Sequence, residues 1–226
     1  MPNEVLFFIK LLIGISIVLF AFRMGKYWLF AILGVYIVLA NIFVAKQITL
    51  FGLAATGGNV LYGCTFLITD LLSEHFSKKD ARRAVVIGFF SALVFLVMSQ
   101  LIIAFQPSGE DFVNDSMKNL FGLTPRIVAA SMAAYLISQF HDVWAFHFWK
   151  NKTGGKYLWL RNNLSTWVSQ LMDSIIFSVV AFLGVFSGDI LLQIIFTTYI
   201  LKIMVALIDT PFIYLSYSLK PNERKL

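Results

Sequence analysis

Long apolar segments separated by short charged loops make up most of the chain. A helix needs about 20 mostly apolar residues to cross the roughly 30 Å hydrocarbon core of a bilayer. The segments that meet this requirement are residues 5–22, 27–45, 84–105, 123–149, 158–186 and 190–217. A further segment, residues 59–76, is shorter and more polar. The pattern therefore predicts an all-α fold, a polytopic transmembrane helix bundle with seven spans.

Residues 47–58, which connect the second span to the short polar one, are rich in glycine. Gly52, Gly57 and Gly58 disfavour a regular helix. A re-entrant or unwound stretch is compatible with this composition, provided that protein or a cavity covers its backbone.

Basic residues indicate the orientation of the spans. Most of the 18 Lys and Arg residues lie at 23–26, 78–83, 150–161 and 220–225, which follow every second span, whereas the loop 106–122 is acidic. Cytoplasmic loops carry an excess of Lys and Arg. The sequence thus predicts an inner-membrane protein with its amino terminus outside and its carboxyl terminus in the cytoplasm.

Composition narrows the functional classes. The chain is 59% hydrophobic and 13% charged, against about 45–50% and 25% in a soluble domain, so the excess apolar surface must face lipid. The net charge of +6 reflects the basic loops rather than a nucleic-acid site. The single cysteine, Cys64, excludes an internal disulfide. His75, His141 and His147 lack the spacing of a metal motif, and we expect neither a metal nor a cofactor.

Ionisable residues lie inside the predicted spans, where they are costly and usually face a bundle interior or a wet cavity. They are Asp70, Asp142, Asp173, Asp209 and Lys202, with Glu74, Arg126 and Arg161 near span ends. A buried pair explains any single one equally well, but the whole set favours a functional cavity.

Two specific pairings are expected among these groups. Lys202 needs a carboxylate, and Asp173 or Asp142 is the natural partner. Asp70 and Glu74 form an unfavourable like-charged i, i+4 pair, for which Arg82, Arg83 or a ligand would compensate.

Two predicted helices carry the same polar stripe. Ser131, Tyr135, Ser138 and Asp142 recur at helical spacing in one span, and Asn162, Thr166, Ser169 and Asp173 repeat that spacing in the next. The string Ser-Gln-x-x-Asp-x-x-x-Phe begins at Ser138 and again at Ser169. Inverted repeats that meet at a central site are typical of secondary transporters, although two interior faces of similar polarity would give the same pattern.

Several segments resemble a known family. The runs 40–52, 63–76, 81–83, 126–143 and 158–174 are similar to the queuosine precursor transporter family, also called the vitamin uptake transporter group. The resemblance covers the chain from about residue 41 onward. It divides the chain into an extra amino-terminal span with its basic loop, residues 1–26, and the family transmembrane core, residues 27–226.

The resemblance implies a non-enzymatic transporter that imports a 7-deazaguanine, such as the 7-cyano or 7-aminomethyl form, by alternating access. Its partners would be this small molecule and the lipid bilayer, with no nucleic acid; a homo-oligomer is left open. The polar stripes and the resemblance together give the candidate substrate-binding residues Asn41, Thr69, Asp70, Glu74, Arg126, Ser131, Tyr135, Gln139, Asp142, Arg161, Asn162, Ser165, Thr166, Gln170, Asp173, Lys202 and Asp209.

A guanine-like edge offers adjacent N–H donors and a carbonyl acceptor, and its ring stacks on aromatic side chains. Asp142 or Asp173, with Gln139 or Gln170, matches the edge, and Tyr135 or Trp167 offers the ring. Asp70 or Glu74 would meet the cation of the aminomethyl form. Protons, sodium or facilitated diffusion remain open as the driving force.

One alternative lies within transport, and a second belongs to another class. One is the substrate-binding membrane subunit of an ATP-driven importer, since the chain has no nucleotide-binding motif of its own. The other is a membrane-embedded enzyme acting on lipid or isoprenoid, which the absence of paired acidic motifs disfavours.

Overall fold

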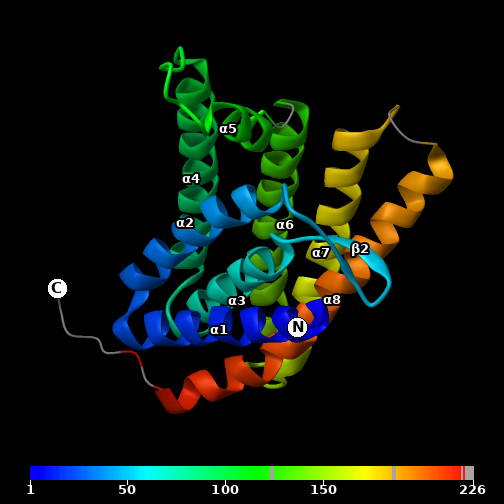
Figure 1. Cartoon of the computed structure of the whole chain (residues 1–226). Helices are drawn as coiled ribbons and strands as arrows, with labels where there is room; N and C mark the ends of the chain where they lie inside the picture. The colour runs from blue at the N-terminus through cyan, green and yellow to red at the C-terminus, as the bar shows by residue number, and fades with distance from the viewer. Residues whose placement is uncertain (123–124, 185–186, 220, 222–226) are drawn as a thin grey trace.

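The computed structural model describes residues 1–122, 125–184, 187–219 and 221. The described residues are mostly helical, and one short β-hairpin follows the second helix (Figure 1). The elements are α1 (Asn3–Met24), α2 (Lys26–Phe43), β1 (Gln47–Leu50), β2 (Leu53–Thr56), α3 (Asn59–His75), α4 (Lys78–Ala104), α5 (Asn114–Phe121), α6 (Pro125–Lys152), α7 (Leu158–Phe182) and α8 (Gly188–Leu219).

The long helices correspond to the predicted spans. Within the described ranges, α1, α2, α4, α7 and α8 are long and apolar enough to cross a membrane. The start of the predicted span 123–149, the end of 158–186 and the basic residues Lys220, Arg224 and Lys225 lie outside the described residues.

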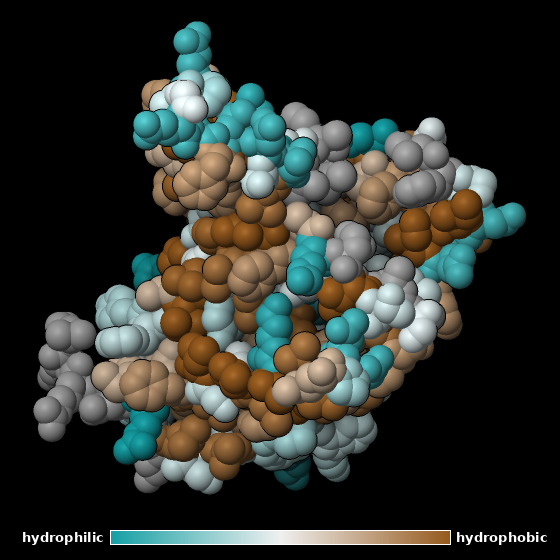
Figure 2. Space-filling model, in the orientation of Figure 1, coloured by the Kyte–Doolittle hydropathy of each residue, from teal (hydrophilic) through white to brown (hydrophobic). Residues whose placement is uncertain are grey.

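Large apolar side chains remain exposed on the outer faces of these helices. On α4 they include Val86, Phe90, Val97, Met98 and Leu101. Figure 2 shows hydrophobic side chains over much of the middle of one face, with hydrophilic side chains gathered around α5. A soluble protein rarely exposes such a continuous apolar surface, so these faces suit contact with lipid.

Helix α3 is the central helix of the bundle. Almost every residue from Val60 to Ser73 is buried, because α1, α2, α4, α6 and α8 all pack against it. Its 17 residues need not face lipid, which explains why its sequence is shorter and more polar than the others. Ser77 then caps α4 by accepting a hydrogen bond from the Asp80 N–H at 3.0 Å.

The glycine-rich segment forms an antiparallel β-hairpin, β1–β2, rather than an unwound stretch. Leu50 pairs with Leu53, so the turn consists of Phe51 and Gly52, both with positive φ. This is the two-residue turn geometry that matches the twist of a hairpin. Its backbone groups pair with each other, which satisfies them without a helix.

The start of α1 holds this hairpin. Asn3 donates to the Thr49 carbonyl at 3.0 Å, and the Phe51 N–H donates to Glu4 at 3.0 Å. Lys10 donates to the Gly57 carbonyl at 2.6 Å just after β2. The hairpin is therefore fixed to the end of the bundle where α2 ends and α3 begins.

Candidate functional site

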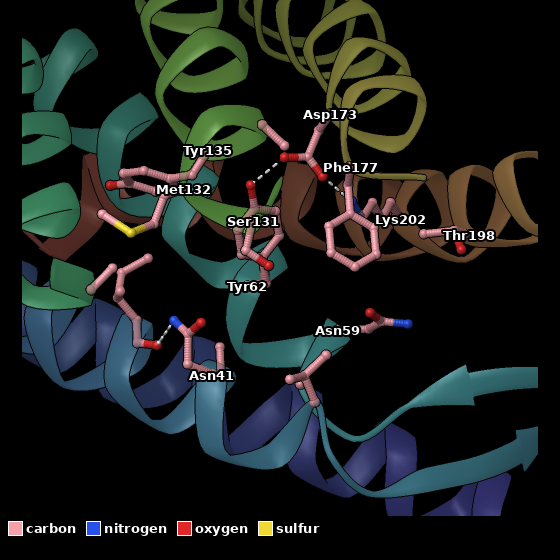
Figure 3. A pocket seen from close by; sticks show the side chains of 16 residues that line it. Asn41, Asn59, Tyr62, Ser131, Met132, Tyr135, Asp173, Phe177, Thr198 and Lys202 are labelled. Carbon is pink, nitrogen blue, oxygen red and sulfur yellow. Dashed lines mark hydrogen bonds and ion pairs between the residues drawn. The ribbon is translucent and has the colours of Figure 1, made fainter. Parts of the chain in front are cut away.

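A cavity of about 150 Å³ lies between α2, α3, α4, α6, α7 and α8. A single buried water needs only about 10–15 Å³, so the space suits a small organic molecule. Its polar lining comprises Asn41, Asn59, Tyr62, Ser131, Tyr135, Asp173, Thr198 and Lys202 (Figure 3). Its apolar lining includes Ile37, Ala40, Met132 and Phe177. Apolar walls with a few convergent polar groups are typical of ligand sites.

Asp173 of α7 is the most strongly coordinated group in this cavity. Its carboxylate accepts hydrogen bonds from the Tyr62 hydroxyl at 2.5 Å and from Ser138 at 3.3 Å, and it forms an ion pair with Lys202. The Lys202 ammonium also lies 5.0 Å from the centre of the Tyr62 ring. Asp173 and Lys202 are 3% and 5% exposed, so each neutralises a charge that would otherwise be very unfavourable.

The prediction that Lys202 pairs with a carboxylate of a neighbouring span is confirmed, with Asp173 as the partner. The two polar stripes also meet as expected. Ser138 of α6 donates to Asp173 of α7, and Thr166 of α7 donates to Asp142 of α6 at 3.3 Å. The two stripes thus exchange hydrogen bonds between two antiparallel helices.

A second polar layer is buried beyond the cavity. Gln139 donates to Thr65 at 3.1 Å and accepts from Thr69 at 3.1 Å, which ties α6 to α3. Thr166 lies within hydrogen-bond distance of both Asp142 and Asp70. Asp209 of α8 and Asn162 of α7 lie beside them. Tyr135 and Asp142 are seven residues apart in α6, which places this layer about 10 Å from the cavity along the helix.

A third group of polar side chains connects the opposite ends of α3, α6, α7 and α8. Glu74 of α3 forms ion pairs with Arg161 of α7 at 2.5 Å and Lys150 of α6 at 3.0 Å, and it accepts a hydrogen bond from Tyr217 of α8. The Arg161 guanidinium also lies over the Phe146 ring at 5.6 Å. The cations that reach Glu74 are therefore not Arg82 or Arg83; the latter pairs with Asp80 instead.

The structure distributes the predicted substrate-binding residues over these regions. Asn41, Ser131, Tyr135, Asp173 and Lys202 line the cavity. The buried residues outside its lining are Thr69, Asp70, Gln139, Asp142, Asn162, Ser165, Thr166, Gln170 and Asp209. Glu74 and Arg161 form the far-end cluster. Trp167, the alternative stacking ring, does not line the cavity.

Arg126 belongs to none of these regions. It is exposed, and its guanidinium donates to the carbonyls of Val180 and Leu183 at 2.7 Å. These carbonyls belong to the end of α7, where backbone acceptors lack helical partners. Its role is to cap that helix end rather than to line the cavity.

Some cavity residues were not among the predicted set. Tyr62, Asn59, Phe177, Met132 and Thr198 contribute to the lining. The sequence pattern could have identified two of them. Tyr62 lies seven residues before Thr69, on the same helical face, and Phe177 is the last residue of the second repeated string. The other three have no pattern that separates them from ordinary helix residues.

Comparison with known proteins identifies the family. Residues 56–216 match the family model described as "Putative vitamin uptake transporter". The chain belongs to this family. The match begins at the end of β2 and continues into α8, so it includes the helices that carry Tyr62, Asp173 and Lys202.

Two curated relatives share the similarity. A protein of Bacillus subtilis (strain 168), named "Probable queuosine precursor transporter", is 38% identical over 224 residues, which cover 99% of this chain and 98% of the relative. A Haemophilus influenzae protein of the same name is 26% identical over 161 residues, covering 70% of this chain and 66% of the relative. No solved structure matches the chain. Its helices and its membership of the vitamin uptake transporter family make it a multi-pass membrane protein.

Proposed function

We propose that this member of the vitamin uptake transporter family imports a queuosine precursor, a 7-deazaguanine base, across the cytoplasmic membrane. The names of the two relatives support the substrate class. The observation that carries the proposal is the cavity in which Asp173, Lys202 and Tyr62 meet between apolar walls.

The chemistry of this cavity matches a flat heterocycle. A deazaguanine edge presents N–H donors, for which Asp173 is the acceptor, and a carbonyl, for which Lys202 is the donor. The Asn41 amide faces the same space from α2 (Figure 3). Tyr135 and Phe177 offer ring faces, and a base that stacks on an aromatic side chain gains about 1–3 kcal/mol.

We infer a seven-span arrangement with the amino terminus outside, in which α3 and α6 cross the membrane together with the five apolar helices. Asn41 lies near the end of α2 and Asn59 at the start of α3, so the cavity lies toward the outer ends of the helices. Glu74, Lys150, Arg161 and Tyr217 lie at their cytoplasmic ends.

Alternating access would follow from this asymmetry. The ion pairs of Glu74 hold α3, α6, α7 and α8 together on the cytoplasmic side, while the cavity accepts the base from the other side. Release into the cytoplasm then requires that the Glu74 contacts open as the outer ends close. No covalent step is involved.

Complementation tests the proposal. A bacterium that neither makes nor imports the precursor is supplied with 7-cyano- or 7-aminomethyl-7-deazaguanine, and queuosine is measured in its transfer RNA. We expect queuosine with the wild-type chain and with the control Asp189→Asn, whose side chain is exposed on α8. We expect a loss of at least about tenfold with Asp173→Asn, because charged hydrogen bonds contribute about 1.5–3 kcal/mol each. Absence of queuosine with the expressed wild-type chain would refute the proposal.

A further inference from the structure

Three carboxyl groups are buried inside the helix bundle, outside the cavity lining. Asp70 comes from α3, Asp142 from α6 and Asp209 from α8, and they are 1%, 0% and 3% exposed. Asp142 and Asp209 both lie close enough to Asp70 to interact with it electrostatically. Three helices therefore place acidic groups together where water does not reach them.

These carboxyl groups have no cationic partner among the described residues. The ion pairs in that part of the chain involve Glu74, Asp80 and Asp173, and none reaches the three aspartates. One oxygen of each group, Oδ1 of Asp70 and Asp209 and Oδ2 of Asp142, is buried without any donor from the described side chains or backbone. A buried carboxylate without a partner costs several kcal/mol, so three ionised groups cannot persist here together.

The contacts between the groups indicate how the charge is removed. The Thr166 hydroxyl lies 3.4 Å from Asp70 Oδ2 and 3.3 Å from Asp142 Oδ1, but it has only one proton to donate. One hydroxyl within reach of both carboxyl groups places Asp70 and Asp142 next to each other. Two neighbouring buried carboxyl groups without a cation do not both stay ionised, and such pairs share one proton.

Within the part of the chain that the structure describes, no other group supplies a countercharge to these aspartates. From α7 the neighbours are neutral: Asn162 beside Asp209, and Ser165, Thr166 and Ser169 beside Asp142. Other titratable groups on the packed helices are engaged elsewhere or uncharged. Lys10 donates to the Gly57 carbonyl, Tyr36 donates to the Gly14 carbonyl, and Tyr62 and Lys202 contact Asp173. Cys64 is a buried free thiol, His141 contacts Ser169, His75 contacts Ser216, and Asp80 pairs with Lys26. His147 and Tyr135 of α6 and the Glu74 cluster also lie on these helices, outside the three aspartates.

We propose that Asp70, Asp142 and Asp209 form a proton-binding site that couples import to the proton gradient. A proton from the outer water binds to a carboxylate oxygen of the Asp70–Asp142 pair, and it leaves to the cytoplasmic water after the helices rearrange. No other bond forms or breaks. The coupling part rests on the proposed import function, whereas the shared proton follows from the burial of the carboxyl groups, their unpartnered oxygens and the single hydroxyl between Asp70 and Asp142.

The position of the site explains the coupling. Helix α6 carries Asp142 and the cavity residues Ser131 and Tyr135, and helix α7 carries Thr166 and Asp173. A helix rearrangement that changes access to the cavity therefore also changes access to the carboxyl cluster. Among the described residues, no group of three or more His, Cys, Asp or Glu side chains has the arrangement of a metal site, which favours a proton over a metal cation as the occupant.

Infrared absorption of the purified protein in lipid vesicles tests the site without any substrate. We expect the carbonyl band of a protonated carboxyl group at neutral pH, and we expect Asp142→Asn or Asp70→Asn to remove or shift it. The exposed control Asp189→Asn leaves the band in place. A wild-type protein without this band would overturn the proposal, even if the variants failed to fold.

Vesicle transport tests the coupling. One proton per base and a gradient of one pH unit, acid outside, drive about tenfold accumulation of labelled deazaguanine, since 1.4 kcal/mol corresponds to a factor of ten. We expect a protonophore to abolish this accumulation, and Asp142→Asn to lack it while Asp189→Asn retains it. Accumulation driven by a sodium gradient instead, or equal distribution of the base at every pH gradient, would overturn the coupling. Failure to carry any deazaguanine while the infrared band is present would refute the import function and leave the proton site standing.

Discussion

The two aspartates of the repeated string differ in their surroundings although their local sequences agree. Asp142 and Asp173 each follow Ser-Gln-x-x, and each accepts a hydrogen bond from a hydroxyl of the other helix. The surroundings differ because a different helix, outside the α6–α7 pair, supplies the ionisable neighbour of each aspartate. Helix α8 brings Lys202 to Asp173, whereas α3 brings Asp70 to Asp142.

The comparison shows that the neighbours, rather than the motif, decide what each carboxyl group does. A nearby cation favours the ionised carboxylate, and a nearby carboxylate disfavours it. Asp173 therefore suits the recognition of a polar base at the edge of a cavity. Asp142, about 10 Å away along the helix pair, suits the uptake and release of a proton.

The largest effect is expected from breaking the Asp173–Lys202 pair. Lys202→Met leaves the buried Asp173 carboxyl group without its cationic partner, and removing one partner of a buried pair costs about 3–5 kcal/mol. We expect loss of precursor uptake and a lower midpoint of thermal unfolding. The double variant Lys202→Met/Asp173→Asn should recover part of the stability but no uptake. Normal uptake by Lys202→Met would show that the Asp173–Lys202 ion pair is not required for substrate binding in the cavity.

A smaller loss of affinity is expected when only the wall of the cavity is altered. A Cβ at Gly88 of α4 would overlap the Tyr135 hydroxyl, so Gly88→Ala should push the Tyr135 ring and lower the affinity for the base about tenfold, or 1.4 kcal/mol. Tyr135→Phe in the same background should restore part of it, because it removes the overlapping atom.

Gly34→Ala is the matched control for this change. Its Cβ would lie 3.0 Å from the Ser91 side chain, at a contact between α2 and α4 outside the cavity lining. An affinity loss at Gly34 as large as that at Gly88 would indicate general disturbance of helix packing rather than an effect of Tyr135.

The smallest effects are expected from removing single hydroxyl donors, and they should distinguish the role of Asp173 from that of Asp142. Ser138→Ala removes a donor to Asp173, and Thr166→Val removes the hydroxyl between Asp70 and Asp142. Each hydrogen bond contributes about 1 kcal/mol, or about fivefold. We expect Ser138→Ala to weaken base binding and Thr166→Val to reduce accumulation driven by a pH gradient. The reverse assignment of these two effects would contradict the division of roles.

Much of the fold follows from the sequence because the membrane imposes simple rules. Apolar length predicted the long helices, and helical spacing brought the stripes of α6 and α7 together. The cost of a buried ammonium predicted a carboxylate partner for Lys202. These inferences depend on the local sequence pattern or on one large energetic cost, that of burying an unpaired charge.

The remainder depends on packing that no local pattern specifies. The hairpin was missed because the glycines of residues 47–58 disfavour a helix without specifying an alternative structure. Tyr62 reaches the cavity from α3, which five other helices surround, and Phe177 reaches it from α7, which packs against α6 and α8. Glu74 pairs with Arg161, 87 positions later in the chain, and sequence distance does not reveal such contacts.

Equilibrium binding of labelled deazaguanine to the purified protein tests the central claim most directly. The affinities of the Asp173→Asn and Asp142→Asn variants are compared with that of the wild type, with Asp189→Asn as the exposed control. The account predicts that Asp173→Asn loses affinity by at least about tenfold, since it gives up charged hydrogen bonds, and that it loses more than Asp142→Asn. Equal losses, or a larger loss in Asp142→Asn, would contradict the assignment of the base to the Asp173–Lys202–Tyr62 cavity.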